Sequence, residues 1–142
     1  MKIRDILRTK GDSVATVAPD SNVRDLLAKL AEYNIGALVV SEDGRTIAGI
    51  VSERDVVRRL HERGPDLLDS TVASIMTSEV LTCSADDHIE ELRQTMTDHR
   101  IRHMPVTRGD QLVGIVSIGD IVKSTIAELE TEREHLVGYI QS

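Results

Sequence analysis

Two copies of one short motif each contain a serine that is followed three residues later by an aspartate. The first copy reads Gly-Ile-Val-Ser-Glu-Arg-Asp over residues 49–55, and the second reads Gly-Ile-Val-Ser-Ile-Gly-Asp over residues 114–120. The apolar run before each serine predicts a strand that ends at Ser52 or Ser117, and a helix follows at once. Each motif therefore predicts a hydroxyl and a carboxylate at the opening of a helix.

Two interpretations of this spacing are open. Ser-x-x-Asp resembles a capping box, in which the serine caps the helix and an acid in the first turn faces the positive end of the helix dipole. The same hydroxyl, the exposed backbone N–H groups and the helix N-terminus could instead receive phosphate or ribose oxygens. A carboxylate could also accept both hydroxyls of a ribose. The two roles are compatible, because a cap orders the groups that a ligand would meet.

The motif belongs to a longer internal repeat. The segment that starts at Thr16 matches the segment that starts at Thr82, with an offset of 66 residues that becomes 65 after a turn. A shorter echo precedes each copy, "IRDIL" at 3–7 and "VASIM" at 72–76. Repeats are the first feature to seek in a sequence. They divide the chain into residues 1–66 and 67–142, with residues 62–71 as a linker marked by Gly64-Pro65.

Each repeat has the pattern strand–helix–strand–strand–helix. The first repeat predicts a helix after the cap at Asp20–Asn22, strands at 37–41 and 47–52, and a helix from 53 to about 61. The second predicts a helix at 87–99, strands near 103–107 and 112–117, and a helix from about 118. Because one repeat of about 60 residues would be marginally stable alone, we predict a mixed α/β (α+β) fold. It consists of tandem βαββα repeats packed sheet to sheet about a pseudo-twofold axis, with a short N-terminal helix and an extended C-terminal helix.

Composition argues against a protein that binds nucleic acid. The net charge is -7, whereas phosphate binding needs clustered Lys and Arg. The chain has no Trp or Phe and only two Tyr, so it lacks the aromatic side chains on which bases stack. We expect no membrane segment, because no apolar run approaches roughly 20 residues. The charged N-terminus predicts no signal peptide. A single cysteine, Cys83, excludes an intramolecular disulfide and favours a reduced, cytoplasmic location, and with no resolving partner it predicts a plain thiol. No metal site and no catalytic pair of side chains is expected.

The ordered double set of motifs resembles a pair of CBS (cystathionine-β-synthase) domains, also called a Bateman module. The resemblance covers about residues 2–125 and rests on "IRDIL"/"VASIM", the helix starts at Asp20 and Asp86, "IGALVV"/"IRHMPV" and the two Gly-Ile-Val-Ser motifs. It implies two clefts between the sheets that bind AMP, ADP, ATP, S-adenosylmethionine or NAD-type ligands. It also implies a regulatory role toward an unidentified partner protein rather than catalysis, since a barrel enzyme needs roughly 250 residues.

The resemblance implies that each cleft draws on both repeats. Asp55 and Asp120 would hold ribose, the two motif serines would contact ribose or phosphate, and Ile and Val side chains would sandwich adenine. The first cleft would be formed by Val14, Ala15, Ile35, Gly36, Ala37, Ile115, Ser117 and Asp120. The second cleft would be formed by Val80, Leu81, Ile101, Arg102, His103, Ile50, Ser52, Arg54 and Asp55, with Arg58 as an additional phosphate contact.

The two clefts differ in charge. The second gathers Arg54, Arg102 and His103, while the first has glycine or alanine at the corresponding positions. Guanidinium groups match the geometry of phosphate. We therefore expect the second cleft to bind the more phosphorylated ligand, with His103 acting either as a phosphate contact or as a plain strand-edge histidine.

The C-terminal segment has its own pattern. Val122, Leu129 and Leu136 are seven residues apart, as are Ile126, Arg133 and Ile140. This spacing predicts that the last helix continues to about Tyr139 with a partly apolar face, which either folds back on the chain or forms a dimer contact. We expect a homodimer. The alternative function is a structural or dimerisation module with non-functional clefts, which the intact Ser and Asp of both motifs disfavour.

Overall fold

A computed structural model describes residues 1–11 and 14–141. A short helix, α1 (Ile3–Lys10), precedes the first repeat. That repeat contains β1 (Thr16–Val17), α2 (Val23–Tyr33), β2 (Ala37–Val40), β3 (Gly49–Ser52) and α3 (Glu53–Arg63). The second contains β4 (Cys83–Ser84), α4 (Ile89–His99), β5 (His103–Arg108), β6 (Gln111–Ser117) and α5 (Ile118–Gln141). The predicted order and fold class are confirmed, and the element bounds differ from the prediction by at most about two residues.

The two sheets have the same topology. In each sheet the first strand pairs parallel with the second, and the second pairs antiparallel with the third. The antiparallel register places Ala37 opposite Ser52 and His103 opposite Ser117. The beginning of β2 or β5 therefore lies beside the serine that ends the next strand, where a helix opens.

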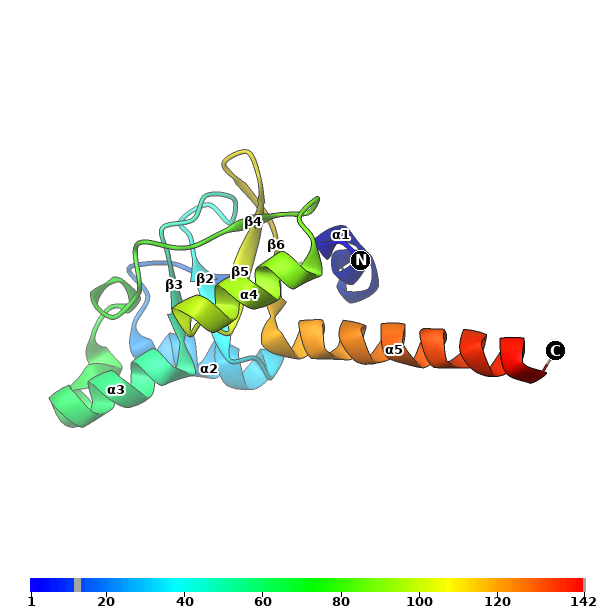
Figure 1. The fold of residues 1–142 in the computed structure, drawn as a ribbon. Coiled ribbons are helices and arrows are strands. Elements are labelled where there is room, and N and C mark those ends of the chain that lie inside the picture. The colour runs from blue at the N-terminus through cyan, green and yellow to red at the C-terminus, as the bar shows by residue number, and fades with distance from the viewer. Residues whose placement is uncertain (12–13, 142) are drawn as a thin grey trace.

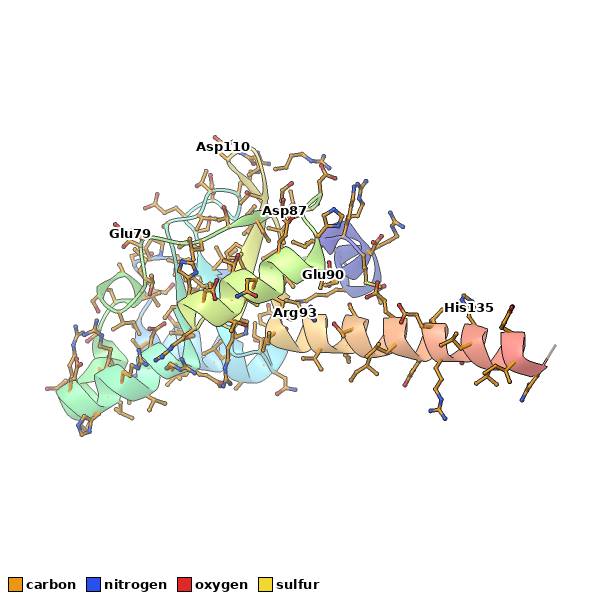
Figure 2. All side chains as sticks on the ribbon, in the orientation of Figure 1. Glu79, Asp87, Glu90, Arg93, Asp110 and His135 are labelled. Carbon is orange, nitrogen blue, oxygen red and sulfur yellow. The ribbon has the colours of Figure 1, made fainter. Side chains whose placement is uncertain are left out.

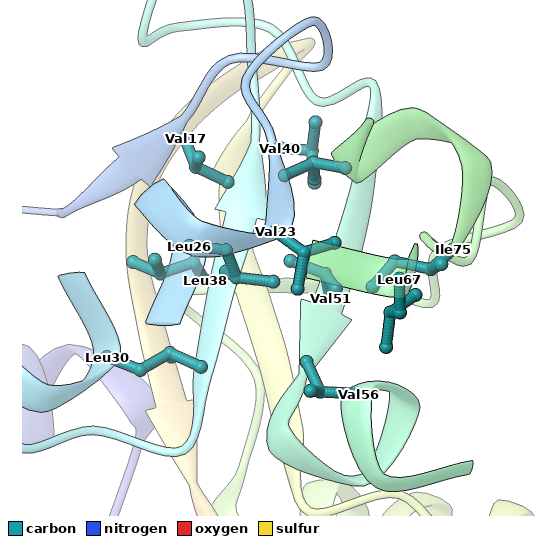
Figure 3. Packing of buried hydrophobic residues seen from close by; sticks show 11 residues of the cluster. Val17, Val23, Leu26, Leu30, Leu38, Val40, Val51, Val56, Leu67 and Ile75 are labelled. Atoms are coloured by element: carbon teal, nitrogen blue, oxygen red, sulfur yellow. The ribbon is translucent and has the colours of Figure 1, made fainter. Parts of the chain in front are cut away.

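Each hydrophobic core takes residues from outside its own repeat. The first core, shown in Figure 3, combines side chains of β1, α2, β2, β3 and α3 with Leu67, Val72 and Ile75. The second core combines side chains of β4, α4, β5, β6 and α5 with Ile3 and Ile6 of α1. The segment that leads into each repeat thus packs on the other repeat.

Backbone hydrogen bonds secure this exchange in the same way on both sides. The Ile3 N–H donates to the Asp87 carbonyl at 3.0 Å, just before α4. The Val72 N–H donates to the Ser21 carbonyl at 2.8 Å, just before α2. Each leading segment is therefore bonded to the residues just before a helix, α4 on one side and α2 on the other. These two helices correspond in the repeat, so the two contacts have the pseudo-twofold relation that was predicted.

The segment between the repeats, predicted to be a linker, is structured. It forms two 3-10 helices, η1 (Gly64–Asp69) and η2 (Val72–Ser74). Leu67 is fully buried in the first core. Gly64 and Pro65 mark the end of α3 and the start of η1, but the apolar side chains that follow keep this segment packed on the sheet.

Two glycines allow the exchanged segments to approach the sheets. A Cβ on Gly114 of β6 would lie 2.6 Å from Leu7 Cδ2 of α1. A Cβ on Gly49 of β3 would lie 2.7 Å from both Met76 Sδ and the Thr77 carbonyl oxygen. Leu7 and Met76 are the last residues of the paired echoes "IRDIL" and "VASIM". The glycine of each motif is therefore the position against which a side chain packs, and that side chain comes from the segment that leads into the other repeat.

The last helix leaves the body of the molecule. Ile121, near its start, is buried in the second core, whereas Leu129 and Ile140 are 58% and 79% exposed. Figure 1 shows α5 projecting beyond the rest of the chain. The helix reaches Gln141, close to the predicted end, and its distal part does not fold back. Among the described residues, no helix is both long and apolar enough to cross a bilayer.

We predict that Gly114→Ala and Gly49→Ala both destabilise the fold, by about 1–3 kcal/mol in the free energy of unfolding. The change at Gly49 has the larger cost, because its new methyl meets a backbone oxygen and the one at Gly114 meets a movable leucine. Urea unfolding measures both. Gly138→Ala is the matched control, because its Cβ meets nothing within 4 Å, and it should stabilise α5 by up to about 1 kcal/mol. Equal effects at all three positions would contradict the packing described here.

Candidate functional site

A cavity of about 640 Å³ lies where the two repeats meet. Four segments form its wall: the start of β2, the β3–α3 junction, the loop that leads into β4 and the α4–β5 junction. It contains all ten residues predicted for the second cleft together with seven others. The lining residues are Gly36, Ala37, Ile50, Ser52, Glu53, Arg54, Asp55, Arg58, Thr77, Glu79, Val80, Leu81, His99, Arg100, Ile101, Arg102 and His103.

Both Ser-x-x-Asp motifs form the capping arrangement. Asp55 Oδ2 accepts hydrogen bonds from the Ser52 N–H at 2.8 Å and from Ser52 Oγ at 3.0 Å. Asp120 Oδ2 accepts from the Ser117 N–H at 2.9 Å, and the Asp120 N–H donates to Ser117 Oγ at 3.2 Å. The described hydrogen bonds engage only Oδ2 of each carboxylate, so the cap orients each Asp and leaves Oδ1 available.

The cavity is rich in cationic side chains although the chain is acidic. Arg54 and Arg58 come from α3, while Arg100 and Arg102 flank Ile101. None of these four guanidinium groups forms an ion pair with a described carboxylate. By contrast, Arg59, on the same helix but outside the cavity, pairs with Glu62 at 3.0 Å. Unpaired arginines at one surface attract anions.

A smaller cavity of about 350 Å³ lies next to the cavity of about 640 Å³. The two share Arg54, Arg100, Ile101 and Arg102 as lining residues. Met96 and Ile118 add apolar side chains to the wall of the smaller cavity. Three of the four arginines therefore line both cavities.

Among the residues predicted for the first cleft, Ile115 and Asp120 both bond to a lysine, and Ser117 bonds to Asp120. Lys10 Nζ donates to Asp120 Oδ2 at 2.8 Å and to the Ile115 carbonyl at 2.9 Å. Burial raises the pKa of Asp120, but the Lys10 ammonium and the hydrogen bonds from Ser117 together hold that pKa below its ordinary value. The carboxylate is thus ionised and already has a cationic partner.

The other residues predicted for the first cleft lie in or next to the strands of the first repeat. Val14 and Ala15 precede β1, and Ile35 lies between α2 and β2 with a side chain 39% exposed. Gly36 and Ala37, also predicted for the first cleft, line the cavity of about 640 Å³. The antiparallel register brings them there, because it pairs Ala37 with Ser52 and directs the Glu53 N–H to the Gly36 carbonyl at 2.9 Å.

His103 lies between the two clefts. Its ring is half-buried on the wall of the second cleft, and its backbone pairs with Ser117 of the first. Burial, together with the positive charge of Lys10, lowers the pKa of His103 below 6.5, although Glu53 and Asp120 act in the opposite direction. The neutral ring is therefore favoured in the folded protein.

Sequence analysis missed several residues of the second cleft. These are Glu53, Thr77, Glu79, His99 and Arg100. The run His-Arg-Ile-Arg-His at 99–103 was a usable signal, since alternating cations surround one apolar residue. Arg100 ends α4 in the left-handed region with a φ of 54°, a conformation that sequence does not reveal for an arginine. Glu79 lies in the loop before β4, as Figure 2 shows.

Neither metal chemistry nor thiol chemistry is indicated by the described residues. No group of three His, Cys, Asp or Glu side chains among them could hold a metal ion. Burial, helped by the negative charge of Asp87, raises the pKa of Cys83 to about 12. This thiol is therefore protonated at neutral pH and a poor nucleophile.

Comparison with known families gives a match over most of the chain. The family described as the CBS domain matches residues 3–62 and 72–126. A CBS domain-containing mitochondrial protein of Arabidopsis thaliana, CBSX3, is 35% identical over 147 aligned residues, which cover 98% of this chain and 71% of that protein. The two matched ranges correspond to the two repeats.

Solved structures give the same result at the level of the fold. A CBS-domain protein from Agrobacterium tumefaciens is 37% identical and superposes with a TM-score of 0.85, covering 88% of this chain and 99% of that one. The CBS domain pair of protein MJ0100, solved with 5′-methylthioadenosine and S-adenosyl-L-methionine, superposes with a TM-score of 0.78 at 23% identity. That alignment covers 88% of this chain and 99% of that one.

We predict that His103 makes the fold less stable as the pH falls. Because the pKa of His103 is lower in the folded chain than its ordinary value of 6.5, the unfolded chain binds the proton first, and acidification through that range favours unfolding. Thermal unfolding from about pH 7.5 to about pH 5.5 should show a smaller drop in Tm for His103→Gln than for the wild type. His135→Gln, on the exposed part of α5, is the control. An unchanged drop in His103→Gln would rule out this role.

Proposed function

The chain belongs to the CBS domain family, and from that membership we propose that it is a regulatory module whose second cleft binds an adenosine-containing nucleotide. It would act on a partner protein rather than catalyse a reaction. The ligand class proposed is AMP, ADP, ATP or an NAD-type dinucleotide. The proposal includes a cytoplasmic location and no nucleic-acid partner.

The observation that carries this proposal is the composition of the 640 Å³ cavity. Small-molecule sites are concave, of about 300–1,000 Å³, and combine apolar walls with a few convergent polar groups. Here Ile50, Val80 and Ile101 supply branched apolar side chains, and Asp55 supplies an ordered carboxylate. The apolar side chains suit a purine base, and the carboxylate suits a ribose.

Phosphate would lie at the opening of α3. The N-terminus of this 11-residue helix carries a partial positive charge. Arg54 and Arg58 follow along the same helix, and Arg100 and Arg102 face it across the cavity. Four guanidinium groups without carboxylate partners favour a ligand with more than one phosphate. This supports the expectation that the second cleft takes the more phosphorylated ligand.

The solved relative supports the ligand class. The CBS pair of protein MJ0100 shares this fold and holds two adenosine derivatives. Its likeness to this chain is in the fold alone, so the choice among adenosine ligands depends on the arginines described above. A ligand in the second cleft would contact both repeats at once, and it would shift their relative position if the two arrangements bind it with different affinity.

A second candidate function, dimerisation, is supported by α5. Val122, Ile126, Leu129, Leu136 and Ile140 are each at least half exposed. Together with Arg133, which lies between Leu129 and Leu136, they follow one another at alternating spacings of four and three residues. This is the spacing of the residues that face the partner helix in a coiled coil. The two functions are compatible, because this helix projects away from the cleft-bearing body (Figure 1). We propose that a second copy of the chain covers this apolar stripe.

We predict that Arg54→Ala and Arg102→Ala each weaken ATP binding by roughly tenfold to a hundredfold, because each removes a charge-assisted contact to phosphate. Isothermal titration calorimetry with AMP, ADP and ATP measures this, and the loss should grow with the number of phosphates. Arg59→Ala is the matched control on the same helix, since Arg59 pairs with Glu62 outside the cavity.

Unchanged ATP affinity in both arginine variants would refute phosphate binding at this site.

A thermal-shift screen separates the candidate functions at lower cost. A ligand at 100 times its Kd stabilises the fold by about 2.7 kcal/mol. A flat response to every adenine nucleotide would leave only the dimerisation module.

We predict that the chain sediments as a dimer and that the double change Leu129→Asp, Leu136→Asp converts it to a monomer. The charges would have to be buried at the centre of the paired helices, which is unfavourable. Thr131→Asp, on the opposite side of α5, should leave the dimer intact. A monomeric wild type in sedimentation velocity, or a dimer that survives the double change, contradicts this interface.

A further inference from the structure

The helices α2 and α4 end in the same uncommon backbone conformation. Asn34 follows α2 with a φ of 52°, and Arg100 follows α4 with a φ of 54°, both in the left-handed region. In each repeat the N–H of the next residue, an isoleucine, donates to a carbonyl in the last turn of the helix, at 3.1 Å in the first repeat and 3.0 Å in the second. The two helix ends are therefore alike in backbone and differ in one side chain.

The two side chains suit this conformation to different degrees. In the left-handed region the Cβ of most residues lies too close to the backbone, and glycine and asparagine tolerate the region best. Asn34 follows this preference, whereas Arg100 does not. An arginine is thus less favourable than an asparagine for this helix end.

Contacts within the fold do not explain the arginine. Its side chain is exposed, and no described carboxylate forms an ion pair with its guanidinium. Arg100 instead lines both the cavity of about 640 Å³ and the cavity of about 350 Å³, and Asn34 lines neither. The side chain that suits the backbone poorly is therefore the one that lies at a cavity.

Arg100 also differs in position from the groups expected to hold adenine and ribose. Those groups, among them Val80 and Asp55, line only the larger cavity. Arg100 lines the smaller cavity as well, together with Arg54 and Arg102. Because phosphates extend a nucleotide beyond its ribose, the outer phosphates are the groups that would reach this shared wall.

We propose that Arg100 is a specificity-determining residue that makes the second cleft prefer ATP to AMP. This inference rests on the proposed function. The first phosphate would lie at the opening of α3, and the outer phosphates would meet the Arg100 guanidinium at the wall shared by the two cavities. This charge-assisted contact is made only with bound ligand. The protein without ligand therefore keeps an unfavourable helix end with no compensating contact.

The test replaces Arg100 with the residue that the first repeat has at the equivalent position. In calorimetry on the full chain, Arg100→Asn should weaken ATP binding by roughly tenfold to a hundredfold and change AMP binding by less than about twofold. The same variant should raise the Tm of the protein without ligand by roughly 2–6 °C, because asparagine suits the left-handed backbone. A loss of affinity together with a gain of stability distinguishes a ligand contact from a structural one.

Two further variants are the controls. Arg100→Lys keeps a cation on a backbone that suits lysine no better than arginine. Its ATP affinity should therefore fall less than that of Arg100→Asn, and its Tm should not rise. Asn34→Arg makes the reverse change in the first repeat, outside both cavities. It should lower the Tm and leave ATP affinity in the second cleft unchanged.

Several outcomes would overturn the inference. Unchanged ATP affinity in Arg100→Asn, or an equal loss for ATP and AMP, shows that Arg100 does not select for the outer phosphates. A Tm that does not rise in Arg100→Asn shows that the arginine stabilises the fold. If ATP binding weakens in Arg54→Ala and Arg102→Ala but not in Arg100→Asn, the proposed function stands and the role of Arg100 fails. Absence of ATP and AMP binding in the wild type refutes both.

Discussion

The structure depends on the contact between each leading segment and the sheet of the other repeat. Leu7 packs against Gly114, and Met76 packs against Gly49, at distances that leave no room for a Cβ unless the neighbouring atoms shift. Each repeat alone would leave one core incomplete, because Ile3 and Ile6 complete the second core and Leu67, Val72 and Ile75 complete the first. This exchange joins two marginal halves into one cooperative unit.

The same exchange brings charged residues to both helix openings. It places the loop that holds Glu79 on the wall of the cavity of about 640 Å³ and the end of α1 beside Asp120. The two Ser-x-x-Asp caps are nearly alike in their backbone geometry, so the caps provide equivalent scaffolds. The charges placed around them differ. Four arginines that form no ion pair with a described carboxylate line the cavity beside the first cap, and Lys10 bonds to Asp120 of the second. Duplication thus gives two related helix openings with different charged surroundings.

Much of this arrangement could be predicted from local pattern. Strand and helix periodicity, the N-cap at Asn22 and the repeated motif predicted the element order, and the second-cleft residues Ser52, Arg54 and Asp55 do line one cavity with Ile101 and Arg102. Local pattern could not predict what non-local packing decides. The strand register brings Gly36 and Ala37, predicted for the first cleft, to the wall of the cavity of about 640 Å³. The burial of Leu67, within the linker predicted at 62–71, depends on a sheet more than ten residues away in sequence.

The sequence by itself determined the duplication, the two capped helix openings and the cationic character of the second cleft, because each of these depends on residue types within short segments of the chain. Only the tertiary structure decided which leading segment packs on which sheet, and therefore that Lys10 reaches Asp120 across 110 positions of the chain. The physical reason is that burial and shape select partners irrespective of their separation in sequence. A local sequence pattern indicates which chemistry a side chain can perform. The packing of Leu7 on Gly114 determines which carboxylate Lys10 contacts.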